Sequence, residues 1–139
     1  MSRKQSREFA MRLLYQMELR GDDDRGEQLE LAFEESEITY TSKDRAYIED
    51  VVRGVFANLG ELDGAVAENA RGWKLARIAR IDLSILRLCI YEIKYREDIP
   101  YNISINEAVE LAKKYGAEES GSFINGILSN IVPSDNFKS

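Results

Sequence analysis

Basic side chains, which can bind phosphates, are concentrated in two short stretches of this sequence. Residues 1–20 hold five basic residues against two acidic ones, and residues 71–80 hold four basic residues and no acidic one. The chain as a whole is acidic, with a formal net charge of −6. If folding brings the two stretches together, they form a local patch that could meet nucleic-acid phosphates. The alternative is that both are ordinary solvated faces.

Side chains for catalysis are scarce. The 139 residues include no His and a single Cys, Cys89. Ser–His–Asp and Cys–His catalysis, His-ligated zinc and internal disulfides are therefore excluded, and we expect no enzyme, no cofactor and no metal. Cys89 lies in an apolar run, which predicts a small buried hydrophobic residue rather than a nucleophile. A chain without disulfides fits a reducing, cytoplasmic compartment.

The length and composition predict one domain over residues 1–139, with 44% apolar and 32% charged residues. No stretch reaches the roughly 18 uninterrupted apolar residues of a membrane span. The N-terminal charges are not followed by an apolar region, so no secretory signal is expected.

Apolar residues recur with helical spacing along almost the whole chain, and no segment reads as a convincing strand. The strongest periodicity, with apolar pairs every four residues, runs from Tyr47 to Leu59. The expected helices cover about residues 6–20, 27–36, 44–59, 62–71, 82–95, 104–115 and 120–131, with a short helix or turn at 73–80. The pattern predicts an all-α fold, a compact bundle of about seven helices.

Polar residues mark the expected helix starts. Ser6 and Asp82 are predicted N-caps, and residues 41–44 and 104–107 resemble capping boxes. The acidic residues 22–26 predict a solvated loop, because their spacing does not match a calcium-binding loop.

Four segments carry the most specific pattern in the chain. They read REFAMRLLYQ (residues 7–16), RIDLSILRLCIYEI (80–93), IPYNISINEAVELAKKYG (99–116) and SFINGIL (122–128). In this order and spacing they closely resemble the NusB family of transcription antitermination factors. The resemblance covers about residues 3–132. Some RNA cytosine methyltransferases carry a NusB-like domain before their catalytic domain, but the stand-alone factor is the closer match.

The resemblance implies a fold of two three-helix units packed roughly perpendicular, plus an extra helix. It also implies a function without catalysis. Members of the family bind the single-stranded boxA element of nascent RNA together with NusE, a protein of the small ribosomal subunit. The assembly acts on RNA polymerase as an antitermination complex, which reads through terminators in ribosomal RNA operons.

The family also implies which residues bind RNA. Arg3, Lys4 and Arg7 match its basic N-terminal arm, although here the three are spaced out rather than clustered. Such side chains would neutralise phosphates with a salt-dependent affinity. The alternative for them is a frayed, solvated terminus. Lys74 and Arg77, from the second basic stretch, match less well and are included weakly.

Three further RNA-binding positions lie near the last predicted helix. Phe123 and Asn125 match a family F-x-N-G element, where the ring could stack on a splayed base and the amide could read a base edge. Phe123 also fits the apolar stripe of its helix with Ile127, so a core position is the alternative. Glu119 lies at a family position that influences RNA binding.

For the protein partner, Tyr15 and Asp82 match family positions that face NusE. The main alternative for the whole chain is a protein–protein interaction module, or a homodimer, with little RNA affinity of its own.

Overall fold

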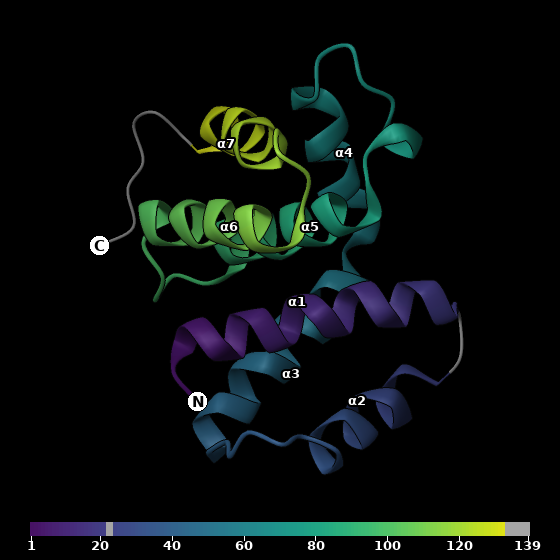
Figure 1. Ribbon diagram of the computed structural model, residues 1–139, viewed down its shortest axis with the longest axis vertical. Coiled ribbons are helices and arrows are strands. Elements are labelled where there is room, and N and C mark those ends of the chain that lie inside the picture. The colour runs from purple at the N-terminus through teal and green to yellow at the C-terminus, as the bar shows by residue number, and fades with distance from the viewer. Residues whose placement is uncertain (22–23, 133–139) are drawn as a thin grey trace. The chain divides into compact units, whose positions relative to one another are not determined.

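The computed structural model describes residues 1–21 and 24–132, and every regular element among them is helical. The elements are α1 (Arg3–Arg20), α2 (Arg25–Glu34), α3 (Ser42–Ala57), α4 (Leu59–Asn69), a 3-10 turn η1 (Leu75–Arg77), α5 (Arg80–Tyr95), α6 (Tyr101–Tyr115) and α7 (Ser120–Ile131) (Figure 1). The prediction of an all-α fold with about seven helices is confirmed. Part of the predicted acidic loop, Asp22 and Asp23, lies outside the described residues.

The chain divides into two compact units, Met1–Arg53 and Gly54–Ser139. The first holds α1, α2 and most of α3, and the second holds the end of α3 and the remaining helices. The perpendicular packing of two units and the single domain over residues 1–139 stay predictions. No helix in the described part of the chain is long and apolar enough to cross a lipid bilayer.

In the first unit, α1 begins at a capping box that Ser2 forms with Gln5. The Ser2 hydroxyl accepts a hydrogen bond from the Gln5 N–H (3.0 Å), and the Gln5 side-chain oxygen accepts one from the Ser2 N–H (2.8 Å). The prediction that Ser6 caps this helix is wrong. The helix begins one turn earlier, where Ser2 is the N-cap and its hydroxyl accepts from an open N–H group. Ser6 therefore lies within the helix, and it is buried.

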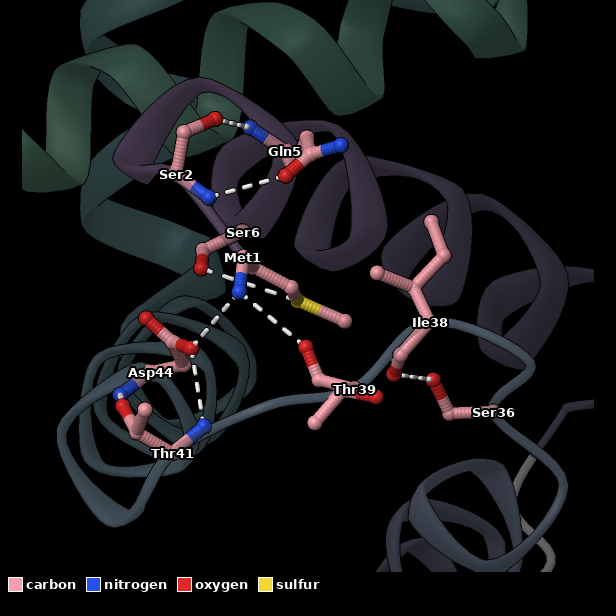
Figure 2. A network of polar contacts seen from close by, with 9 residues as sticks. All are labelled: Met1, Ser2, Gln5, Ser6, Ser36, Ile38, Thr39, Thr41 and Asp44. Carbon is pink, nitrogen blue, oxygen red and sulfur yellow. Dashed lines mark hydrogen bonds and ion pairs between the residues drawn. The ribbon is translucent and has the colours of Figure 1, made fainter.

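Figure 2 shows how the start of the chain is tied to the start of α3. The Met1 amine donates to the Thr39 carbonyl (3.0 Å) and to the Asp44 carboxylate (3.1 Å). The same carboxylate accepts from the Thr41 N–H, while the Thr41 hydroxyl accepts from the Asp44 N–H. The capping box predicted at residues 41–44 is therefore confirmed, and it also anchors the N-terminus beside α3.

In the second unit, α5 is the central helix. Twelve consecutive residues of α5, from Asp82 to Ile93, are buried, and α5 contacts α4, α6 and α7. Figure 1 shows α6 alongside α5. The helix begins at Arg80 after Ala79, so the prediction that Asp82 is its N-cap is wrong. Asp82 already lies in the first helical turn, where its side chain bonds to another helix.

The capping box predicted at residues 104–107 is also wrong. The helix α6 begins earlier, at Tyr101, with Pro100 in the N-cap position. A proline lacks the N–H that a helix start would leave unsatisfied, so it fits there at no cost. Ser104 is buried inside the helix, and its hydroxyl donates to the buried Glu92 carboxylate (2.7 Å).

Candidate nucleic-acid interface

The basic arm of the first unit is the first turn of α1 rather than a frayed end. Lys4 is exposed, Arg3 is half-buried and Arg7 is only 4% exposed. The guanidinium carbon of Arg3 lies 4.3 Å from the centre of the Tyr47 ring, and that of Arg7 lies 5.9 Å from the same ring. Cation–π contacts with one tyrosine therefore hold both arginines against α3.

These placements give the three predicted residues different accessibility. Lys4, and in part Arg3, are open to an approaching phosphate. The buried Arg7 instead lies near the Tyr47 ring. Periodicity assigned Tyr47 to an apolar stripe, and nothing in that spacing indicates that its ring also carries two cations. Tyr47 is therefore a positioning residue that the sequence pattern did not reveal.

Tyr15, predicted to face a protein partner, lies on the same face of α1 as Lys4. Eleven residues are about three helical turns, so the two side chains project in similar directions about 16 Å apart along the helix. Tyr15 is half-buried, and Arg12 between them is exposed. One face of α1 thus carries a predicted RNA-binding residue at one end and a predicted partner-binding residue toward the other.

In the second unit, the second basic stretch leads through η1 into α5. Lys74 and Arg77 are both exposed. Trp73, directly before Lys74, is 55% exposed, and its ring meets the Phe123 ring edge-on, with centroids 5.8 Å apart and an interplanar angle of 67°. The structure therefore brings the basic stretch to the first turn of α7. Trp73 was not predicted as a site residue, although an aromatic between basic residues is a signal of single-strand binding.

The position of Phe123 decides between a core role and a surface role. The buried face of α7 consists of Ser120, Gly121, Ile124, Ile127 and Leu128. Phe123 is half-buried at the flank of this face and contacts Trp73, so it is not a core residue.

The other two predicted positions on or beside α7 are both exposed. Glu119 precedes Phe123 by four residues and projects from the same side, at the N-cap position of α7. Asn125 follows Phe123 by two residues, about 200° around the helix, and therefore lies on the opposite flank. The structure thus groups Glu119 and Phe123 and leaves Asn125 apart from them.

Asp82, in the first turn of α5, contacts the start of α7. One carboxylate oxygen, Oδ2, accepts a hydrogen bond from the Ser120 hydroxyl (3.1 Å), and that hydroxyl accepts from the Ala117 N–H (2.9 Å). The other oxygen, Oδ1, is buried without a hydrogen-bond partner among the described residues. Burial raises the pKa of the Asp82 carboxyl, and the Ser120 hydrogen bond opposes that rise. The carboxylate therefore links α5 to the end of the α7 helix that carries Phe123.

Known proteins resemble this chain over nearly its whole length. The model of the NusB family matches residues 4–133. A transcription antitermination protein NusB of Acetivibrio thermocellus is 54% identical over 95% of this chain and 89% of its own length. One of Ruminiclostridium cellulolyticum is 50% identical over 97% of this chain and 91% of its own length.

Solved structures give the same result. The structure of T. maritima NusB superposes with a TM-score of 0.86 at 36% identity and covers 94% of this chain and 90% of that one. A structure of the antitermination factors NusB and NusE in complex with double-stranded RNA matches with a TM-score of 0.81 at 27% identity, over 94% of this chain and 97% of that one. On the family match and the full-length relatives, the chain belongs to the NusB family.

Proposed function

We propose that this chain is a transcription antitermination factor that binds boxA RNA of ribosomal RNA operons together with NusE, and so promotes read-through by RNA polymerase. The observation that carries the proposal is the match along nearly the whole length to relatives named transcription antitermination protein NusB. The solved complex of NusB and NusE with double-stranded RNA supports NusE and RNA as partners.

Phosphate binding would rest on basic residues in each unit that are exposed or, in the case of Arg3, half-buried. Lys4 and Arg3 serve in the first unit, and Lys74 and Arg77 in the second. Each cation that neutralises a phosphate releases counterions, so the affinity would fall as salt rises. The overall charge of −6 keeps this attraction local, which limits nonspecific binding to nucleic acid.

Base recognition would rest on the start of α7. Phe123 offers part of its ring to an unstacked base, and Asn125 offers an exposed amide on the other flank of the helix. Asp82 contributes indirectly, because its carboxylate accepts the hydrogen bond from the Ser120 hydroxyl. Because its free oxygen is enclosed, we assign it the positioning of α7, while Tyr15 offers the accessible contact for NusE.

The proposed function involves no catalysis. The protein would act in the cytoplasm, where RNA is transcribed. No step in the proposed function requires a bond to be made or broken by the protein. What the chain supplies is a surface that joins RNA to a second protein.

The test is equilibrium binding of the purified chain to a short fluorescein-labelled boxA RNA and to a scrambled RNA of the same composition. We expect boxA to bind more tightly at every salt concentration, and both affinities to fall with salt. Both titrations are repeated with NusE present. Equal affinity for the two RNAs even then would refute the RNA-recognition part and favour a protein-interaction module.

A further inference from the structure

We infer that Trp73 forms, with Phe123, a two-ring stacking site for the bases of single-stranded RNA, flanked by cations that hold the RNA backbone. The inference deepens the proposed function and rests on it. It adds Trp73, the turn that presents it and the flanking cations Arg71 and Arg80 to the RNA-binding surface.

The first argument is the exposure of the indole. Trp73 is the single tryptophan of the chain, and 55% of it is exposed to solvent. A large aromatic ring left in water contributes little to stability, because its apolar area is not buried. The Phe123 ring meets it at an interplanar angle of 67°, and the exposed fraction leaves part of the indole surface open for another flat group.

The second argument is that the turn before η1 holds Trp73 in place. The Trp73 N–H donates to the Ala70 carbonyl (3.0 Å), which closes the turn. Within it, Gly72 adopts a φ of +78°, in the left-handed region that favours glycine. The ring therefore projects from a defined turn and is braced by Phe123, so little entropy is lost when a base stacks on it.

The third argument is the charge around the ring. Residues 71–80 carry four basic residues, which are all exposed, and no acidic residue. The four are Arg71, Lys74, Arg77 and Arg80. None of them forms an ion pair with any described residue. A cluster of exposed cations without acidic partners, in an acidic chain, favours an anionic ligand.

The two features together favour single-stranded RNA over an acidic protein. Carboxylates would satisfy the cations, but they would leave the rings without a stacking partner. A single strand presents phosphates and unstacked bases alternately along one chain, so it satisfies both at once. Every base has an aromatic face, so the site would add affinity without demanding one base.

The experiment uses the intrinsic fluorescence of Trp73, which reports on this one site. The chain is titrated with a 12-nucleotide boxA RNA, with the same RNA carrying abasic positions, and with inorganic polyphosphate. Affinity is measured separately by the anisotropy of labelled RNA. We expect the intact RNA to quench the emission. Abasic RNA and polyphosphate should quench it much less.

The matched variants are Trp73→Ala, Trp73→Phe and Tyr95→Ala. Tyr95 is an exposed ring at the other end of α5 and serves as the control. Loss of one stacked base predicts about 5- to 150-fold weaker binding for Trp73→Ala. Trp73→Phe should retain most of the affinity, and Tyr95→Ala should be unchanged. Circular dichroism confirms that each variant is folded.

Three results would overturn the inference, and they can be distinguished. If boxA RNA binds selectively while Trp73 emission and the affinity of Trp73→Ala stay unchanged, the stacking site is wrong and the proposed function stands. Equal quenching by polyphosphate would likewise leave only a charge effect. If the unmodified chain binds no RNA even with NusE, the proposed function fails and the stacking site fails with it.

Discussion

The Ser120 hydroxyl donates to the buried Asp82 carboxylate across 38 residues of sequence, and the same oxygen accepts from the Ala117 N–H. One hydroxyl thus links the first turn of α5, the loop after α6 and the first residue of α7. Because Phe123 follows three residues later, the orientation of the predicted base-binding end of α7 depends on this link.

Replacing Ser120 by Ala tests the strength of the link. It would leave both Asp82 carboxylate oxygens buried without a donor, which costs about 1–3 kcal/mol of unfolding free energy. Urea denaturation measures the change. Ser129→Ala, at an exposed position of the same helix, is the control and should change stability by less than about 0.5 kcal/mol. Equal stability of the two variants would contradict the role of the hydrogen bond.

Gly116 protects the same link by leaving space for Ser120. A Cβ at Gly116 would lie 2.5 Å from Ser120 Oγ and 2.8 Å from the Ala112 carbonyl oxygen. Gly116→Ala should therefore displace Ser120 and destabilise the protein by about 1–3 kcal/mol.

The control for this substitution is Gly64→Ala, within α4, where a Cβ meets nothing within 4 Å. That variant should stabilise by roughly 0.4–1 kcal/mol, since alanine reduces the freedom of the unfolded chain. Thermal unfolding compares the pair, and a shift in the same direction for both would contradict the steric account.

The pH dependence of stability follows from Asp82. Its pKa in the folded chain is raised by burial, above an unfolded value of about 3.9. The contribution of the neutral carboxyl is therefore fully present below about pH 3.9 and is lost as pH rises through the folded pKa. Asp82→Asn cannot ionise and lacks this loss.

Urea denaturation of both proteins between pH 3.5 and 7 measures the effect. The stability of the unmodified chain relative to Asp82→Asn should fall with rising pH, because other groups cancel in the difference. A difference that rises with pH would mean that the folded chain favours the ionised carboxylate, contrary to the burial described here.

Lys4 and Arg7 should separate RNA binding from stability. Lys4→Gln removes an exposed cation and should reduce the slope of log affinity against log salt by about 0.7, with a smaller change in stability than Arg7→Gln. Arg7→Gln removes a buried guanidinium from the Tyr47 ring and should lower the unfolding free energy. The charge-matched control is Lys94→Gln. Lys94 lies near the end of α5, about 20 Å along the helix from Arg80 and hence from the second basic stretch. A loss of RNA affinity as large in Lys94→Gln would show that only net charge matters.

Periodicity predicted most helices because they bury one stripe of apolar residues, as α3 does between Tyr47 and Val55. The central helix α5 is instead buried nearly all round. The helix starts were less predictable. Ser6 and Ser104 both have the residue type of a cap, but Ser2 and Pro100 begin the helices earlier. A serine near a helix start can cap the helix or bond inside it, and only the tertiary partner decides between these roles.

The site was predictable in residue type rather than in arrangement. The basic residues could be read directly, whereas the burial of Arg7 depends on Tyr47, forty residues away. Likewise, helical spacing allowed Phe123 to be core or surface, and its contact with Trp73 places it at the edge. Long-range pairings of this kind leave no mark on local spacing.

The central claim, joint recognition of RNA and NusE, is tested most directly by measuring the boxA RNA dissociation constant with and without saturating NusE. If the two ligands assemble on this chain cooperatively, NusE should tighten RNA binding by about 5- to 150-fold, and RNA should tighten NusE binding by the same factor. An RNA affinity that NusE leaves unchanged would contradict the account.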